Sequence, residues 1–167
     1  MTAATADLTF RELLDYTAAE TARWAAYVAA HPEALDVPFA AGRTATVRGV
    51  VQHVFAVERR YADRLLDDPV SAYDVIPTDS ADALFAAGRD ARARLERYLA
   101  TASDADLARR LTFETLSAGT QSASARKIVA HALLHGVRTW AQLATVVRQR
   151  GVPTDGRHDL LFSNALA

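Results

Sequence analysis

Histidine occurs in two separated segments that have the periodicity of amphipathic helices. The first segment begins at Val51 with Val-Gln-His-Val-Phe-Ala-Val-Glu and contains His53; the second begins His-Ala-Leu-Leu-His at His131 and contains His135. In each segment a histidine lies on or beside the apolar stripe that should face a core. A buried imidazole needs a hydrogen-bond partner or a metal ion. The two segments therefore predict a candidate site at these histidines.

Each of these side chains also has a structural interpretation. A single histidine on an apolar helix face is more often a hydrogen-bonded core residue than a ligand. For His131 we expect a hydrogen bond to a neighbouring helix. For Glu58 we expect an ion pair with an arginine such as Arg138 or Arg23, with general-base chemistry as the alternative.

Other charged and aromatic residues are predicted to have structural roles. His31 and His158 fall in loops and carry no functional signal. A solvated helix surface is the interpretation of the series Arg89, Arg92, Arg94 and Arg97. Core or dimer packing, with substrate stacking as the alternative, is typical of aromatic side chains at helical spacing, here Trp24, Tyr27, Tyr61 and Trp140.

Long helices must position these residues, and the apolar periodicity predicts four of them. They are expected near residues 9–30, 45–67, 80–101 and 123–150. Thr9-Phe-Arg-Glu12 has the form of a capping box that begins the first helix. A loop through Pro38 and Gly42 should connect the first helix to the second.

Two segments outside these helices have a different pattern. Leu111-Thr-Phe-Glu-Thr-Leu116 alternates, and Ser117-Ala-Gly-Thr120 supplies turn residues. A short hairpin or irregular crossover should therefore precede the last helix. After that helix, an apolar run is expected to dock back on the bundle, namely Leu160, Leu161 and Phe162.

Length and composition favour a single domain that covers residues 1–167. A chain of 167 residues can bury about 70% of its unfolded surface around one core. Four helices around one core predict an all-α four-helix bundle, a fold in which sites are built from side chains on facing helices. Lys127 is the single lysine among many arginines, and alanine is abundant, which indicates a GC-rich bacterial genome.

Composition also excludes several classes of protein. Because cysteine is absent, a protein thiol nucleophile, a disulfide framework and cysteine-ligated zinc are excluded. The first residues lack the basic start and apolar run of a signal peptide, and no apolar stretch is long enough to span a bilayer, so we expect a cytoplasmic protein without a membrane partner. A net charge of -1, with acids and bases interspersed, lacks the basic stripe typical of nucleic-acid binding. Nucleotide hydrolysis, serine hydrolysis and metalloprotease chemistry lack their motifs.

The two histidine segments carry a family resemblance. The stretch His-Val-Phe-Ala-Val-Glu-Arg-Arg-Tyr at 53–61, and the stretch from His131 to Gly151 that ends in Gln-Leu-x-x-x-x-Arg-x-x-Gly, resemble the DinB/YfiT-like superfamily of metalloenzymes. The resemblance covers almost the whole chain in helix order. It implies a bundle with an up-down-down-up course and an insertion before the last helix, often dimeric, that binds nickel or zinc through three histidines. For some members it implies activation of a low-molecular-weight thiol such as bacillithiol or mycothiol.

Carried over to this sequence, the resemblance places two metal ligands at His53 and His135 and the third at Thr139. A threonine hydroxyl is a poor ligand for such an ion, and Arg138 would place positive charge beside it. His131 could compensate, because a spacing of four residues puts it on the same helix face as His135. We therefore expect weak or absent binding of Ni or Zn, with water or His131 completing the site.

Two functional classes remain open. As an enzyme, the protein would be a metal-dependent hydrolase or low-molecular-weight-thiol transferase with an incomplete His triad, and the thiol would arrive as a cosubstrate. As a non-catalytic, metal-free bundle, it would bind a small molecule between its helices or act through its surface. In either class we expect a homodimer, because alanine-rich helices offer small residues for close approach.

Overall fold

The computed structural model describes residues 7–42, 44–115, 118–154 and 158–165. Four long helices dominate it: α1 (Phe10–Ala30), α2 (Val47–Leu65), α3 (Ala81–Thr101) and α5 (Ala125–Gln149). The helix bounds expected from the sequence are confirmed to within two residues at every end. None of the described helices combines the length and apolar character that crossing a membrane requires.

Polar side chains explain why the helix starts are readable from the sequence. The backbone N–H of Glu12 donates to Thr9 Oγ1 at 3.2 Å, and the Glu12 carboxylate accepts from the Thr9 N–H at 2.7 Å, so the predicted capping box is present. The side chains that cap the other three long helices are Thr46, Ser80 and Ser124. Each satisfies an N–H group that has no partner within its helix.

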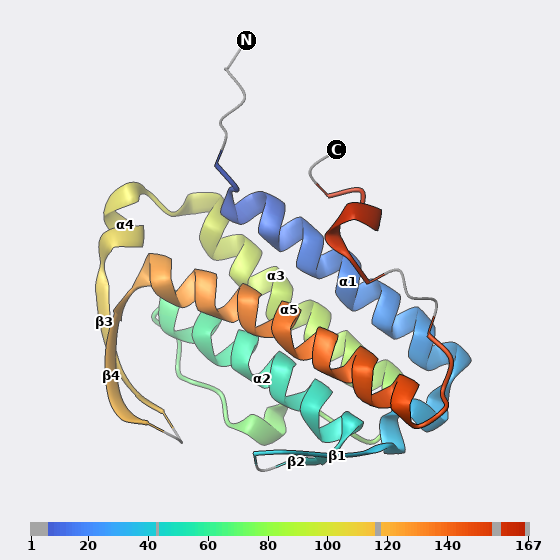
Figure 1. Cartoon of the computed structure of the whole chain (residues 1–167). Helices are drawn as coiled ribbons and strands as arrows, with labels where there is room; N and C mark the ends of the chain where they lie inside the picture. Colours follow the sequence, from blue (N-terminus) through green and yellow to red (C-terminus); the bar gives the residue numbers. More distant parts are fainter. Residues whose placement is uncertain (1–6, 43, 116–117, 155–157, 166–167) are drawn as a thin grey trace.

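The helices form a bundle in which α1 and α2 each pack against both α3 and α5 (Figure 1). One part of the core surrounds Trp24, Phe55 and Trp140, and the stacked indole rings of Trp24 and Trp140 lie 5.3 Å apart. A second part surrounds Leu14, Leu95 and other buried apolar residues nearer the opposite helix ends. The mostly helical fold that the sequence predicts is therefore confirmed.

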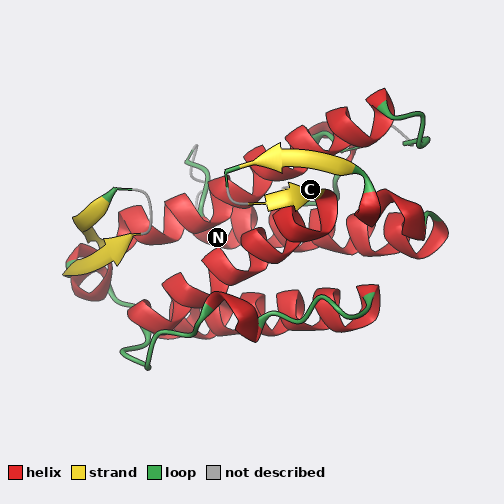
Figure 2. Ribbon diagram, turned by 90° about the horizontal axis from the view of Figure 1, so that it is seen from below, coloured by secondary structure: helices red, strands yellow, loops and turns green. Residues whose placement is uncertain are grey.

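Two short hairpins complete the fold (Figures 1 and 2). The strands β3 (Arg110–Thr115) and β4 (Gly119–Ser124) form an antiparallel pair at one end of the bundle, which confirms the expected hairpin before the last helix. Residue 116, the last of the predicted alternating segment, and residue 117, the first of the predicted turn, lie outside the described residues. The other pair, β1 (Pro38–Ala41) and β2 (Thr44–Thr46), forms where the sequence predicts a loop. Strands this short have no detectable alternation, which explains the difference.

Four further elements are short. They are the 3₁₀ turns η1 (Pro32–Asp36), η2 (Tyr73–Val75) and η3 (Leu160–Phe162), and the helix α4 (Asp104–Ala108).

The C-terminal segment lies beside α1 (Figure 1), but it does not dock as predicted. The side chains of Leu160, Leu161 and Phe162 are 38%, 84% and 56% exposed. The segment is held by a polar contact instead, because Arg23 donates to the Phe162 carbonyl at 2.6 Å. The three apolar residues occupy one 3₁₀ turn, in which successive side chains point in different directions and cannot share one face.

Candidate functional site

The structure brings His53 and His135 together between two packed helices. His53 lies on α2 and His135 on α5, and their ring centroids are 5.2 Å apart in an edge-to-face arrangement. The predicted contact between the two segments is therefore observed. Their role as metal ligands stays a prediction.

Aromatic side chains extend this pair on both sides. The ring of Tyr73 stacks on His53 with centroids 5.9 Å apart. On the other side, His131 lies 5.8 Å from His135, and its ring meets the edge of Tyr61 at 5.4 Å. The hydrogen bond that we expected His131 to make to a neighbouring helix is absent among the described residues. The three histidines are named the histidine cluster below.

All three imidazoles are held in the neutral form at neutral pH. Burial lowers the pKa of His135 to about 4, and the neighbouring His53, His131 and Arg138 act in the same direction. Burial also lowers the pKa of His53. For His131 the causes are burial, then Arg138 and Lys127. A neutral imidazole offers one N–H donor and one lone pair, and the lone pair can accept a hydrogen bond or bind a metal ion.

The position expected for a third imidazole carries a hydroxyl that already has a partner. Thr139 is buried, and its hydroxyl donates to the carbonyl oxygen of His135 at 2.7 Å. Within residues 7–165, apart from the undescribed gaps, no group of three or more His, Asp or Glu side chains is arranged to hold a metal ion. The residues present therefore do not fit a three-histidine metal centre. Two imidazoles alone rarely hold a catalytic ion.

A buried ion pair lies behind the cluster. Glu58 is fully buried, and its carboxylate receives two hydrogen bonds from Arg92 on α3, at 2.5 and 3.1 Å. The same guanidinium also donates to the hydroxyl of Thr17 on α1. Burial raises the pKa of Glu58, and the guanidinium of Arg92 opposes that shift. This network joins three helices.

The Glu58–Arg92 pair corrects two predictions. The sequence suggested Arg138 or Arg23 as the partner of Glu58, and it assigned Arg92 to a solvated face. Arg92 is only 8% exposed. A signal for its burial was present, because Arg92 follows Gly88 by four residues and precedes Leu95 by three, and both of those residues are buried on the inner stripe of α3.

The backbone of α5 passes close to this carboxylate beside the histidine cluster. A β-carbon at Gly136 would lie 3.3 Å from Oε1 of Glu58, which is tighter than an ordinary contact. Glycine at the position after His135 therefore allows α5 to pack against the ion pair.

His158, which the sequence analysis assigned to a loop without function, contacts a buried carboxylate. Its Nδ1 lies 2.6 Å from Oε1 of Glu20, a residue that is 3% exposed. The same oxygen accepts a hydrogen bond from the indole N–H of Trp24 at 3.1 Å. Sequence reasoning had no signal for this contact, since 138 positions separate the two partners.

The comparison with known families agrees with the geometry. The profile of the DinB superfamily matches residues 32–143. The matched part contains α2, α3 and α5 as far as Leu143, and thus both facing histidines and Thr139. No curated protein matches the sequence. Because the match covers more than half of the 167 residues, the chain belongs to the DinB superfamily.

Proposed function

We propose that this protein is a DinB-superfamily bundle whose histidine cluster binds a small molecule directly, without a tightly held catalytic metal ion. The observation that carries the proposal is the 2.7 Å hydrogen bond from the Thr139 hydroxyl to the His135 carbonyl. This bond orients the Thr139 hydroxyl along its own helix, and a neutral hydroxyl is a poor ligand for Ni or Zn at the position where the resemblance expects a third histidine. The proposal includes the up-down-down-up helix course that the resemblance implies.

The charges around the cluster support a neutral or anionic ligand. Arg138 lowers the pKa of both His131 and His135, and Lys127 lowers that of His131. Among the described residues no carboxylate forms an ion pair with these three histidines. A divalent cation would meet repulsion without a neutralising ligand. A polar or anionic molecule would instead meet neutral imidazoles and the Nδ1 atom of His135, which is buried and has no hydrogen-bond partner among the described residues.

Metal analysis of protein purified without a histidine tag or chelating resin tests this proposal. We expect nickel and zinc far below one equivalent per chain. After this protein has been treated with a chelator to remove any metal, small carboxylic acids and amides should shift the imidazole NMR signals of His53 and His135 in a saturable way. Stoichiometric metal that is retained after His131→Gln would contradict the proposal, as would a set of probes that never perturbs both imidazoles.

A second candidate function is favoured by the 5.2 Å separation of the His53 and His135 rings. Both imidazoles are neutral, which is the form that binds a metal ion. The two side chains would hold a weakly bound Ni or Zn ion, completed by His131 or water. The chemistry would then be of the hydrolase or low-molecular-weight-thiol transferase type. A zinc titration of the chelator-treated protein by calorimetry separates this candidate from the first.

A further inference from the structure

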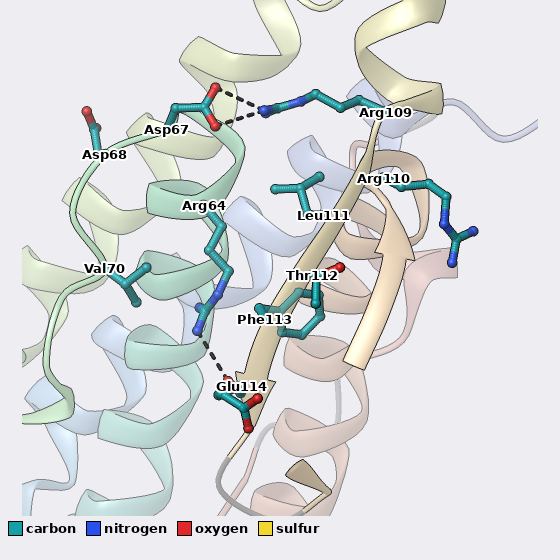
Figure 3. A pocket seen from close by; sticks show the side chains of 10 residues that line it. All are labelled: Arg64, Asp67, Asp68, Val70, Arg109, Arg110, Leu111, Thr112, Phe113 and Glu114. Atoms are coloured by element: carbon teal, nitrogen blue, oxygen red, sulfur yellow. Dashed lines mark hydrogen bonds and ion pairs between the residues drawn. The ribbon is translucent and has the colours of Figure 1, made fainter. Parts of the chain in front are cut away.

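An open groove of about 550 Å³ lies between the C-terminal end of α2 and the outer edge of β3 (Figure 3). Leu111 and Phe113 of β3 form an apolar wall, and Val70 lies on the other side. Arg64 of α2 extends across the groove toward Glu114. The groove is separate from the histidine cluster, and its lining residues include none of the three histidines.

Among the described residues, no carboxylate forms a hydrogen bond or ion pair with the guanidinium of Arg64. It donates to the carbonyl oxygens of Arg60 at 2.9 Å and Glu114 at 3.4 Å, and it lies over the ring of Phe113 at 5.3 Å. Its Nε atom is buried without a hydrogen-bond partner. Burial and the nearby Arg60 lower the pKa of Arg64. Tyr61, Tyr73 and Asp63 oppose this shift from a distance, but in the described part of the chain no carboxylate is bonded to this partly buried charge.

The acidic side chains of the groove are already bonded elsewhere. The pairs are Asp67 with Arg109, Asp68 with Arg94, and Glu114 with the hydroxyl of Thr120. None of these three carboxylates forms an ion pair with Arg64 in the fold. An anion from outside the chain can form one, and a hydrogen bond between charged partners is stronger than one to a carbonyl oxygen.

The edge of β3 supplies a second donor to the groove. In an antiparallel pair, every second residue of a strand forms its backbone hydrogen bonds with the partner strand. The N–H of Ala125 donates to the carbonyl of Arg109 at 2.8 Å, so Arg109 and every second residue after it direct their N–H and C=O groups toward β4. The residues between them, including Thr112, direct theirs to the outer edge. The carbonyl of Glu114, which accepts from Arg64, has this outward direction.

We propose that this groove binds a small organic carboxylate, with the carboxylate on Arg64 and the apolar part of the molecule against Leu111 and Phe113. The outward N–H of Thr112 is available for a polar substituent of the same ligand. The inference goes beyond the proposed function and does not depend on it, since it concerns other residues.

Calorimetric titration with 1-naphthaleneacetate tests the proposal, with the neutral 1-naphthaleneacetamide as the matched control. We expect saturable binding of the acid, about 10- to 100-fold tighter than that of the amide, as loss of one charged hydrogen-bonded contact predicts. Arg64→Gln should weaken binding of the acid by a similar factor, and Arg64→Lys should restore part of it. Arg89→Gln, at an exposed position on α3, should leave the affinity unchanged.

Two further measurements do not depend on the stability of the Arg64 variants. Val70→Asp, at a position that is 43% exposed, places a carboxylate in the groove and should weaken binding by about tenfold. In the unaltered protein, the amide NMR signals of Leu111 to Phe113 should shift on titration, whether or not those of His53 and His135 also shift. Equal affinity for acid and amide would overturn the proposal. Unchanged affinity in a folded Arg64→Gln variant, or shifts confined to other residues, would do the same.

Discussion

Oε1 of Glu58 lies where any side chain at Gly136 would meet it, 3.3 Å from the position of a β-carbon. The carboxylate cannot retreat easily, because Arg92 holds both of its oxygens. A β-carbon next to His135 would therefore force α5 or the carboxylate to shift by a few tenths of an ångström. This close contact lies beside the histidine cluster, because Gly136 follows His135.

Gly136→Ala should lower the free energy of unfolding by about 1–2 kcal/mol. In an unhindered helix the same change would raise it by up to about 1 kcal/mol, because alanine has the higher helix propensity. The sign therefore reports the clash with Glu58. Urea denaturation of the two proteins measures the difference, and a more stable alanine variant would show that the carboxylate moves aside freely.

Arg92→Met should destabilise the fold by about 3–5 kcal/mol, because it leaves the Glu58 carboxylate buried without its partner. The double variant Glu58→Met with Arg92→Met removes both charges, and its free energy of unfolding should fall by less than that of the single variant Arg92→Met. Chemical denaturation of both proteins checks this order. Additive losses would mean that the two side chains do not act as a pair.

Thr139→His should tighten nickel or zinc binding by orders of magnitude. It replaces a hydroxyl bonded to His135 by a third imidazole beside His53 and His135, and three nitrogen ligands at about 2.0–2.1 Å make a site that two cannot. Calorimetry and metal analysis of tag-free protein provide the measurement, with Thr139→Val as the control without a donor. Equal affinities in both variants would show that the helix geometry does not support the triad.

Stability should decrease as the pH falls from about 6.5 toward 4. His135 has a pKa of about 4 in the folded chain, against an ordinary value of about 6.5 in the unfolded chain. Between these two pKa values the unfolded state binds a proton at His135 and the folded state does not, so a lower pH favours unfolding. Above both values His135 is neutral in the folded and the unfolded state, and no stability is lost through this residue. Allowing for partial exposure, we expect a loss of about 1–2 kcal/mol.

Urea denaturation at about pH 7 and about pH 5 measures this loss. In His135→Asn, which does not titrate in this range, the difference between the two conditions should shrink. An identical difference in both proteins would assign the acid sensitivity to other groups, including His53 and His131, whose pKa values are lowered in the same direction.

We also expect the protein to be a homodimer with two-fold symmetry, the commonest closed assembly. The expectation rests on the family resemblance and on the small side chains of the helices. Light scattering across a range of concentrations should give twice the chain mass of 18.1 kDa. A monomer mass at every concentration would refute it.

The sequence predicts the long helices well because their signals are local. Each helix start is marked by a cap residue that bonds to the backbone three positions later, namely Thr9, Thr46, Ser80 or Ser124. The 3.6-residue apolar period that follows each cap is equally local. The β3–β4 hairpin is also visible, since alternation and turn residues lie within one short segment. The β1–β2 hairpin has strands too short for such a pattern.

Partners far apart in the chain are where sequence reasoning fails. Glu58 and Arg92 are separated by 34 positions, and Glu20 and His158 by 138. Which charges meet depends on the rotation of each helix about its axis and on the path of the C-terminal segment, and neither is encoded in a local pattern. The partner of Glu58 was therefore misassigned and His158 was left without a role, whereas the burial of Arg92 could have been inferred from its place on the inner stripe of α3.

By itself the sequence determined the helical segments, since these follow from residue identity and short-range spacing. The resemblance to the DinB superfamily, and not local spacing, indicated that His53 and His135 face each other with Thr139 in place of a third imidazole. Only the tertiary structure decided what surrounds them. Burial and neighbouring cations keep the imidazoles neutral, the Thr139 hydroxyl is bonded to His135, and Arg64 lies in a groove where no carboxylate of the described residues is bonded to it. Desolvation and the distance between charges depend on how the helices and the β3–β4 hairpin pack, so they exist only in the folded chain.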